Sequence, residues 1–193
     1  MVPNISIGIK CQREKSAGLE LALASKTKDV KGISAAFYNN PELVRGVQAG
    51  VVNCADDSIG GQLGCANVAD DIRGFQGGIA NIVNNSSYGV QVGTENVANE
   101  SRGVQMGVVN IVTDLSYGVQ VGILGNIAHD SIGVQLGGIN FCFNDKYGLQ
   151  VGLINYVKDG NFLQIGALNI RGSGPWYTRV SPFIGWKTSR KTF

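Results

Sequence analysis

Few side chains of this chain have the type and the spacing that enzyme chemistry requires. Its one histidine, His129, stands beside Asp130 in a short polar cluster that predicts a turn, whereas a nucleophilic triad needs a histidine held next to a nucleophile. The four cysteines are Cys11, Cys54, Cys65 and Cys142. They form no Cys-x-x-Cys pair and no Cys/His cluster of the kind that binds zinc. We therefore expect no catalytic residue, no metal site and no cofactor.

The charges of the chain narrow the range of partners. Sixteen Lys and Arg residues against fourteen Asp and Glu residues give a net charge of +2, which argues against broad binding to nucleic acid. Residues 171–193 contain basic but no acidic side chains, so this tail could contact anionic lipid, although we interpret it as solvated. Acidic pairs such as Asp56-Asp57 could bind Ca²⁺ only if several converged, and we interpret them as ordinary turns.

The dominant feature is a repeated segment, Gly-x-Gln-x-Gly-x-x-Asn, which recurs every 14 or 15 residues. Its glutamines are Gln48, Gln62, Gln76, Gln91, Gln105, Gln120, Gln135, Gln150 and Gln164. The glycines two residues later are Gly50, Gly64, Gly78, Gly93, Gly107, Gly122, Gly137, Gly152 and Gly166. We interpret both rows as structural, because glycine permits close backbone approach and glutamines of adjacent strands can hydrogen-bond to each other. Weaker copies extend the pattern to about twelve, with degenerate ends as expected for terminal repeats.

Within each copy the side chains alternate with the two-residue period of a β-strand. Val119 and Val121 point one way, and Gly118, Gln120 and Gly122 point the other. No segment has a sustained helical period, so the sequence predicts an all-β protein. We expect one β-repeat domain over residues 1–193. It has degenerate repeats over 1–45, regular repeats over 46–170, and a closing strand with a basic tail over 171–193.

A unit of 14–15 residues can be one strand of an antiparallel meander or one coil of a parallel β-solenoid. The Asp, Asn and Gly clusters between copies are typical of hairpin turns. Tyr88, Tyr117, Tyr147 and Tyr177 recur every two copies, as alternate strands of a meander would. In a solenoid of one-copy coils, many acidic residues would stack about 4.8 Å apart and repel each other. We therefore favour an up-and-down meander closed into a barrel, with the β-solenoid as the alternative.

The repeated unit, as in residues 148–155 (GLQVGLIN), resembles the bacterial surface repeat-containing proteins first named in leptospires. Residues 174–186 are similar to closing segments of such proteins, and the resemblance covers about residues 18–186. It implies a surface or secreted repeat protein with no assigned activity, located at the cell surface or in the outer membrane. The start of the sequence does not read as a signal peptide, and the four cysteines are unpaired, so a cytoplasmic location stays open.

We expect a non-enzymatic structural or surface protein that acts through its shape, as a scaffold, a pore or an adhesive surface. The strands are long enough for an outer-membrane-type β-barrel, which needs about 9–11 tilted residues per strand. The alternative function is that of a soluble β-solenoid, which binds a protein or polysaccharide partner through its regular face of Gln and Asn.

Overall fold

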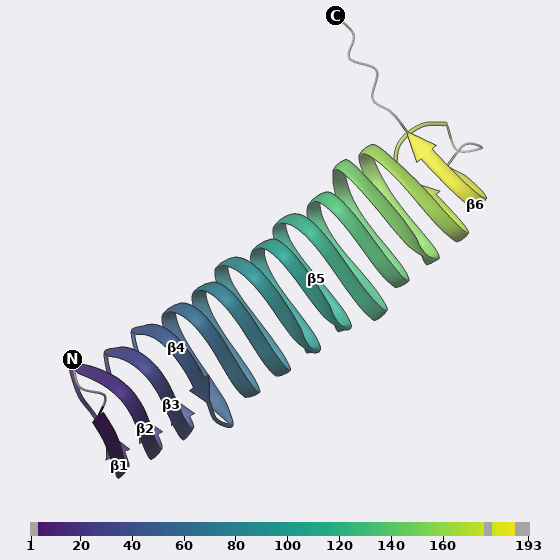
Figure 1. The fold of residues 1–193 in the computed structure, drawn as a ribbon. Helices are drawn as coiled ribbons and strands as arrows, with labels where there is room; N and C mark the ends of the chain where they lie inside the picture. Colours follow the sequence, from purple (N-terminus) through teal and green to yellow (C-terminus); the bar gives the residue numbers. More distant parts are fainter. Residues whose placement is uncertain (1–3, 176–178, 188–193) are drawn as a thin grey trace, which may run out of the picture. The chain divides into compact units, whose positions relative to one another are not determined.

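A computed structural model describes residues 4–175 and 179–187, and it contains strands and no helix over these ranges. The strands are β1 (Asn4–Cys11), β2 (Lys15–Ser25), β3 (Asp29–Asn39), β4 (Leu43–Ala49), β5 (Val52–Arg171) and β6 (Val180–Lys187) (Figure 1). The all-β prediction is confirmed. The predicted end of the basic tail, beyond residue 187, and the aromatic residues Trp176 and Tyr177 lie outside the described residues.

Successive strands pair in parallel, displaced by one repeat. Ser16 pairs with Val30 and Val44 with Ser58, 14 residues further along the chain in both cases. A two-residue hairpin joins antiparallel strands only, so a parallel neighbour means that the chain has completed a turn. Each repeat is thus one coil of a β-solenoid, with about 11 turns over the chain. The chain divides into a first unit, residues 1–98, and a second unit, residues 99–193, and both consist of stacked coils (Figure 1).

The prediction of an antiparallel meander closed into a barrel is wrong. The polar clusters that resemble hairpin turns are places where each coil bends, and their acidic side chains do stack in neighbouring coils. Hydrogen-bond donors beside them offset the repulsion. Asn84 Nδ2 donates to Asp70 Oδ1 at 2.7 Å, and the Ser86 amide donates to Asp71 Oδ1 at 3.1 Å. Asp56 and Asp57 still lie one coil from Asp70 and Asp71, whereas Asn84, Asn99 and Asn144 replace an acid at the first position of later clusters.

The interior is held together by two ladders of side-chain amides, formed within each unit. In the asparagine ladder each Nδ2 donates to the Oδ1 of the next coil at 2.8 Å. Its members are Asn39, Asn53, Asn67, Asn81 and Asn96 in the first unit and Asn110, Asn126, Asn140, Asn155 and Asn169 in the second. In the glutamine ladder each Nε2 donates to the Oε1 of the preceding coil at 2.7–2.9 Å. The two rows of amide dipoles therefore run in opposite directions.

These ladders explain the spacing of the repeated motif. At least eight of the ten ladder asparagines also donate from Nδ2 to a backbone carbonyl of the next coil, as Asn67 does to Gly77 O at 3.0 Å. This arrangement brings the amide close to the glycine that follows the glutamine. A Cβ atom on Gly78 would lie 2.7 Å from Asn67 Nδ2, so a larger residue would displace the ladder. The Gln, Gly and Asn of the motif therefore depend on one another. A row of Ala and Val residues fills the remaining interior.

Different contacts close the first and the last positions of the asparagine ladders. The hydroxyl of Ser34 donates to Asn39 Oδ1 at 2.7 Å, where the asparagine ladder of the first unit begins. In the second unit Asn169 turns its amide to Gly166 O at 3.2 Å. The strand β6 then pairs antiparallel with the end of β5, and its Gly185 pairs with Gln164. This antiparallel strand covers the edge of the last coil, which would otherwise expose unpaired backbone groups.

The outward side chains are mainly apolar, in contrast to the polar interior. Each coil has one innermost residue, which is Ser6, Glu20, Ser34 or one of the nine glutamines. We call the residues one before, one after and three after this position the outer wall. Every described wall residue is exposed or half-buried, and none is charged. The chain places Gln, Asn and Ser inside and Val, Leu and Ile outside, which reverses the usual distribution of a soluble domain.

Candidate functional site

The predicted glutamine and glycine positions all lie inside the coils. The nine glutamines are at most 2% exposed, and their amides bond to one another along the ladder. A partner could reach them only by opening the stack of coils. The expectation that a regular face of Gln and Asn binds a partner is therefore wrong, and any binding site must use other side chains.

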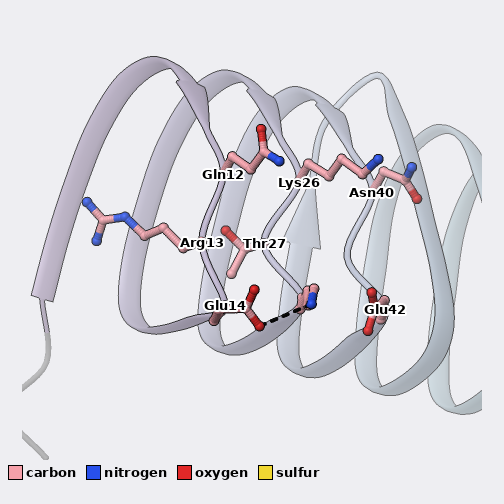
Figure 2. A pocket seen from close by; sticks show the side chains of 8 residues that line it. Gln12, Arg13, Glu14, Lys26, Thr27, Asn40 and Glu42 are labelled. Atoms are coloured by element: carbon pink, nitrogen blue, oxygen red, sulfur yellow. Dashed lines mark ion pairs between the residues drawn. The ribbon is translucent and has the colours of Figure 1, made fainter.

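The first coils form a small polar pocket of about 240 Å³ where three short loops stack between strands (Figure 2). Lys28 Nζ lies 3.2 Å from Glu14 Oε2. The hydrogen bond to Glu14 raises the pKa of Lys28, and the charges of Glu14 and Glu42 act in the same direction. Figure 2 shows Arg13 pointing away from Lys26, so the two other cations do not converge on one point. Lys28 is paired with Glu14, and Arg13 and Lys26 do not combine into an anion site.

Behind this pocket a carboxyl group stands where the regular coils have glutamine. Glu20 is fully buried, and Thr27 donates its hydroxyl to Glu20 Oε2 at 2.9 Å. The Ser25 hydroxyl donates to the other carboxyl oxygen. A carboxyl group can accept one hydroxyl at each of its two oxygens, whereas a glutamine amide has only one oxygen. Glutamate therefore suits these two donors better than the glutamine of the regular coils would. The carboxyl group is structural, because its two oxygens are occupied by neighbours within the same coil.

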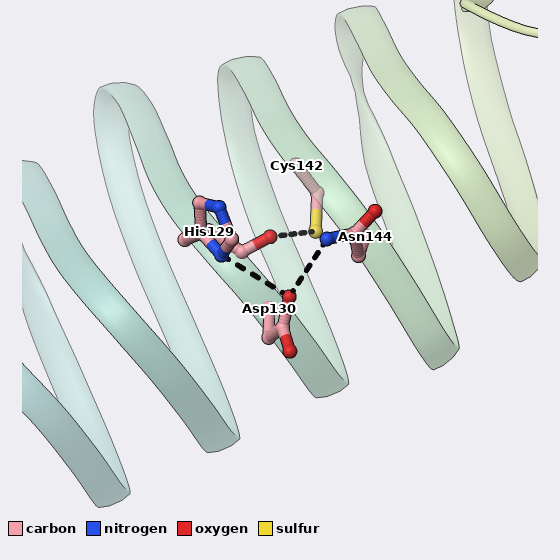
Figure 3. Close-up of polar contacts among 4 residues, drawn as sticks. All are labelled: His129, Asp130, Cys142 and Asn144. Carbon is pink, nitrogen blue, oxygen red and sulfur yellow. Dashed lines mark hydrogen bonds and ion pairs between the residues drawn. The ribbon is translucent and has the colours of Figure 1, made fainter.

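The single histidine does not form a catalytic pair with a cysteine (Figure 3). His129 Nδ1 lies 3.2 Å from Asp130 Oδ1, and the ring stacks on Phe143 with 5.5 Å between the centroids. Cys142 is buried, and its thiol contacts the backbone carbonyl of His129 at 3.8 Å rather than the imidazole. Asn144 Nδ2 donates to Asp130 Oδ1 at 3.1 Å from the next coil. These contacts tie neighbouring coils together at their polar edge.

The remaining cysteines, Cys11, Cys54 and Cys65, form no disulfide and offer no metal ligand set. Cys11 is buried and Cys65 is exposed. Burial raises the pKa of the Cys54 thiol, and burial together with Cys54 raises the pKa of Tyr38. A raised pKa lowers the thiolate fraction and with it the reactivity of Cys54. Over residues 4–175 and 179–187 no three His, Cys, Asp or Glu side chains come together as a metal site.

A more promising surface follows the residues three before each glutamine, which we call the Arg/Tyr row. It consists of Arg45, Ile59, Arg73 and Tyr88 in the first unit and Arg102, Tyr117, Ile132, Tyr147 and Asn161 in the second. In the first unit a shallow groove of about 300 Å³ is lined by this row and by Asp57 and Asp71. The Arg73 guanidinium lies 5.9 Å from the centre of the Tyr88 ring, within the range of a cation–π contact.

The second unit has an open groove at the same positions. It is lined by Arg102, Gly103, Tyr117 and Gly118, with a volume of about 490 Å³. The Tyr117 ring is 57% exposed, and the two glycines beside the row add no side chain that could cover it. This groove therefore combines an aromatic ring with a guanidinium, and Arg102 Nη2 lies 3.6 Å from Glu100 Oε2, which is outside the lining. The two units thus repeat one combination of groups on the outside of the coils.

The sequence contained a signal for this row. The tyrosines recur every two copies. This period indicates that every second coil presents a ring at one outward position. The arginines of the row lie outside the Gly-x-Gln-x-Gly-x-x-Asn motif, so the motif gives no signal for them.

Comparisons with protein-family models, with curated proteins and with solved structures gave no match. Among the residues that the structure describes there is also no helix with the length and hydropathy of a membrane span.

Proposed function

We propose that the chain is a non-catalytic binding module that holds an extended polysaccharide along the Arg/Tyr row. The observation that carries this proposal is the groove at the same repeat positions in both units. Other kinds of binding partner have less support. The glutamine amides are buried in their ladder, and the carboxylates beside the row disfavour a polyanionic partner.

The side chains of the grooves suit the chemistry of sugars. The face of a tyrosine ring offers an apolar platform for the C–H face of a pyranose, which removes apolar area from water. Arginine donates several hydrogen bonds in one plane, and aspartate accepts them, so both can bind sugar hydroxyls. Asp57, Asp71 and Arg73 supply these groups around Tyr88 in the first unit. The open shape of both grooves suits a polymer that lies along the surface.

The spacing of the tyrosines favours a polymer whose chemical unit repeats. Tyr117 and Tyr147 stand three residues before Gln120 and Gln150, which belong to one glutamine ladder with Gln135 between them. The two rings are therefore two coils apart, or about 10 Å at the usual spacing of adjacent strands. Two successive sugars of an extended β-linked chain cover a similar length. Successive tyrosines can thus stack on every second sugar of one strand.

The proposal can be tested by binding the whole chain to insoluble cellulose and chitin, both extended β-linked glucans or their amino derivatives. Dextran, whose linkages do not produce an extended strand, serves as the comparison polymer. We expect retention on at least one of the two β-linked polymers and not on dextran. Replacing both Tyr117 and Tyr147 by alanine is expected to weaken binding about tenfold or more, since each ring contributes about 0.5–1.5 kcal/mol beyond its buried area.

Two control variants separate stacking from general effects. Tyr117→Phe keeps the ring and should keep most of the affinity. Tyr38→Ala removes a partly exposed tyrosine that lies outside the row and should leave binding unchanged. Failure of both β-linked polymers to retain the protein, or equal binding by the double alanine variant, would contradict the proposal.

A further inference from the structure

We infer that two copies of this chain associate through the outer wall, sheet face against sheet face. This interaction goes beyond the proposed function and uses a different set of outward residues. The observation behind it is the absence of any charged side chain from the wall, which recurs coil after coil in both units.

The lack of charge is specific to the wall. The chain places charged residues on its outside at other positions, such as Asp56 and Asp70 at the polar bend and Arg73 in the Arg/Tyr row, so its coils tolerate them. On the wall, by contrast, Ile123 is 77% exposed and Leu153 is 68% exposed. Ile79 and Leu63 are similarly open in the first unit. Large contiguous apolar patches of this kind mark interaction surfaces.

The size of the wall matches what a stable dimer needs. Coils about 4.8 Å apart, each with three outward residues at the two-residue spacing of a strand, give about 700 Å² in the first unit and about 500 Å² in the second. Standard protein–protein interfaces bury about 1,200–2,000 Å² over both partners, and two first-unit walls placed face to face would bury about 1,400 Å². An isologous dimer would cover the same surface on both copies.

The character of the wall favours a second copy over a lipid surface. Its Val, Leu and Ile side chains form ridges repeated at the spacing of the coils, and another copy carries ridges with the same repeat. Two such sheets can interdigitate at about 10 Å separation, as the sheets of a β-sandwich do. Surfaces that meet lipid headgroups are enriched in Trp and Tyr, and the wall contains neither.

The test is the oligomeric state of the full chain, measured by sedimentation velocity over a range of concentrations. We expect a dimer at micromolar concentration. Ile123→Lys and Leu63→Lys, one in each unit, are each expected to raise the dissociation constant at least tenfold, because a charge in the middle of the wall would be buried on association. Ile127→Lys places the same charge at an exposed isoleucine outside the wall and should leave the dimer intact.

Circular dichroism is used to check that each variant is folded, which we expect because these sites are exposed. A wild-type chain that remains monomeric at all concentrations would overturn the inference. So would a dimer that both wall variants leave unchanged. Flotation with vesicles of phosphatidylcholine and phosphatidylglycerol examines the lipid alternative, and wild-type monomers bound to these vesicles would also overturn it.

Discussion

Replacing Gly60 by alanine is expected to lower the free energy of unfolding by about 3–5 kcal/mol, among the largest effects of a single substitution. Gly60 has φ +137°, a backbone conformation that L-residues with a side chain rarely adopt. A Cβ atom there would also overlap the carbonyl oxygen of Gly46 in the preceding coil. Both problems arise in the backbone, so no side-chain rotation can relieve them. Urea denaturation followed by circular dichroism measures the loss.

The neighbouring glycine provides a matched control. A Cβ atom on Gly61 would find its nearest neighbours at 3.8 Å, on Phe75 O, and at 3.9 Å, on Val47 Cγ2. These are ordinary contacts, so Gly61→Ala should change stability by less than about 1 kcal/mol and can even stabilise the chain by restricting the unfolded state. Equal losses for the two variants would show that Gly60 has no special backbone role.

The second large effect is expected when aspartate replaces Asn81 within the ladder. The Asn81 side chain accepts from Asn67 Nδ2 and donates to Asn96 Oδ1, each at 2.8 Å, and it also donates to Val92 O at 3.0 Å. A carboxylate cannot donate to either acceptor, and it would place an uncompensated charge in the interior. We expect a loss of about 3–5 kcal/mol, as when a buried pair is broken.

Asn84→Asp makes the same chemical change on the surface of the same coil. Asn84 is exposed and donates to Asp70 Oδ1 at 2.7 Å. Its replacement creates a pair of like charges in water, which costs about 1 kcal/mol or less. Added salt should recover most of this small loss by screening, and little of the loss at Asn81. A large salt-independent loss at Asn84, or a small one at Asn81, would contradict the assignment of the ladder to the interior.

The repeat, the all-β class and the structural role of the Gln and Gly rows could be inferred from the sequence, because each depends on local spacing. A glutamine flanked at two residues by glycine in nine copies leaves few alternatives to a strand with one small-residue face. The structure supplies the physical reason, since Gly78 leaves room for the amide of Asn67.

The direction of the chain between copies could not be inferred in the same way. The alternation within a strand is identical in a meander and in a coil, and Asp/Asn clusters suit both a hairpin and a bend. The expected repulsion between stacked acids favoured the meander, because it took no account of the hydrogen-bond donors beside those acids. Asp70 and Asp71 each receive a hydrogen bond from the next coil, which the charges alone do not reveal.

The candidate site was only partly visible in the sequence for a related reason. Which face of a strand lies inside depends on the topology, and the alternation of side chains alone does not specify it. Once the coils close on the amide ladders, function must lie on the outward residues, where Tyr117 and Arg102 are neighbours in successive coils. The period of the tyrosines indicated a regular row, but its partners across the groove come from other parts of each coil.

The most direct test of the solenoid is the distance between residues 130 and 144. Spin labels are attached to Asp130→Cys and Asn144→Cys after the four native cysteines have been replaced. In the solenoid these residues lie in adjacent coils, where the native side chains are 3.1 Å apart. Strong dipolar coupling, consistent with backbones about 5 Å apart, is therefore the expected result. In a meander the two positions would lie at opposite ends of a strand, about 40 Å apart, and a distance of that order would contradict the fold described above.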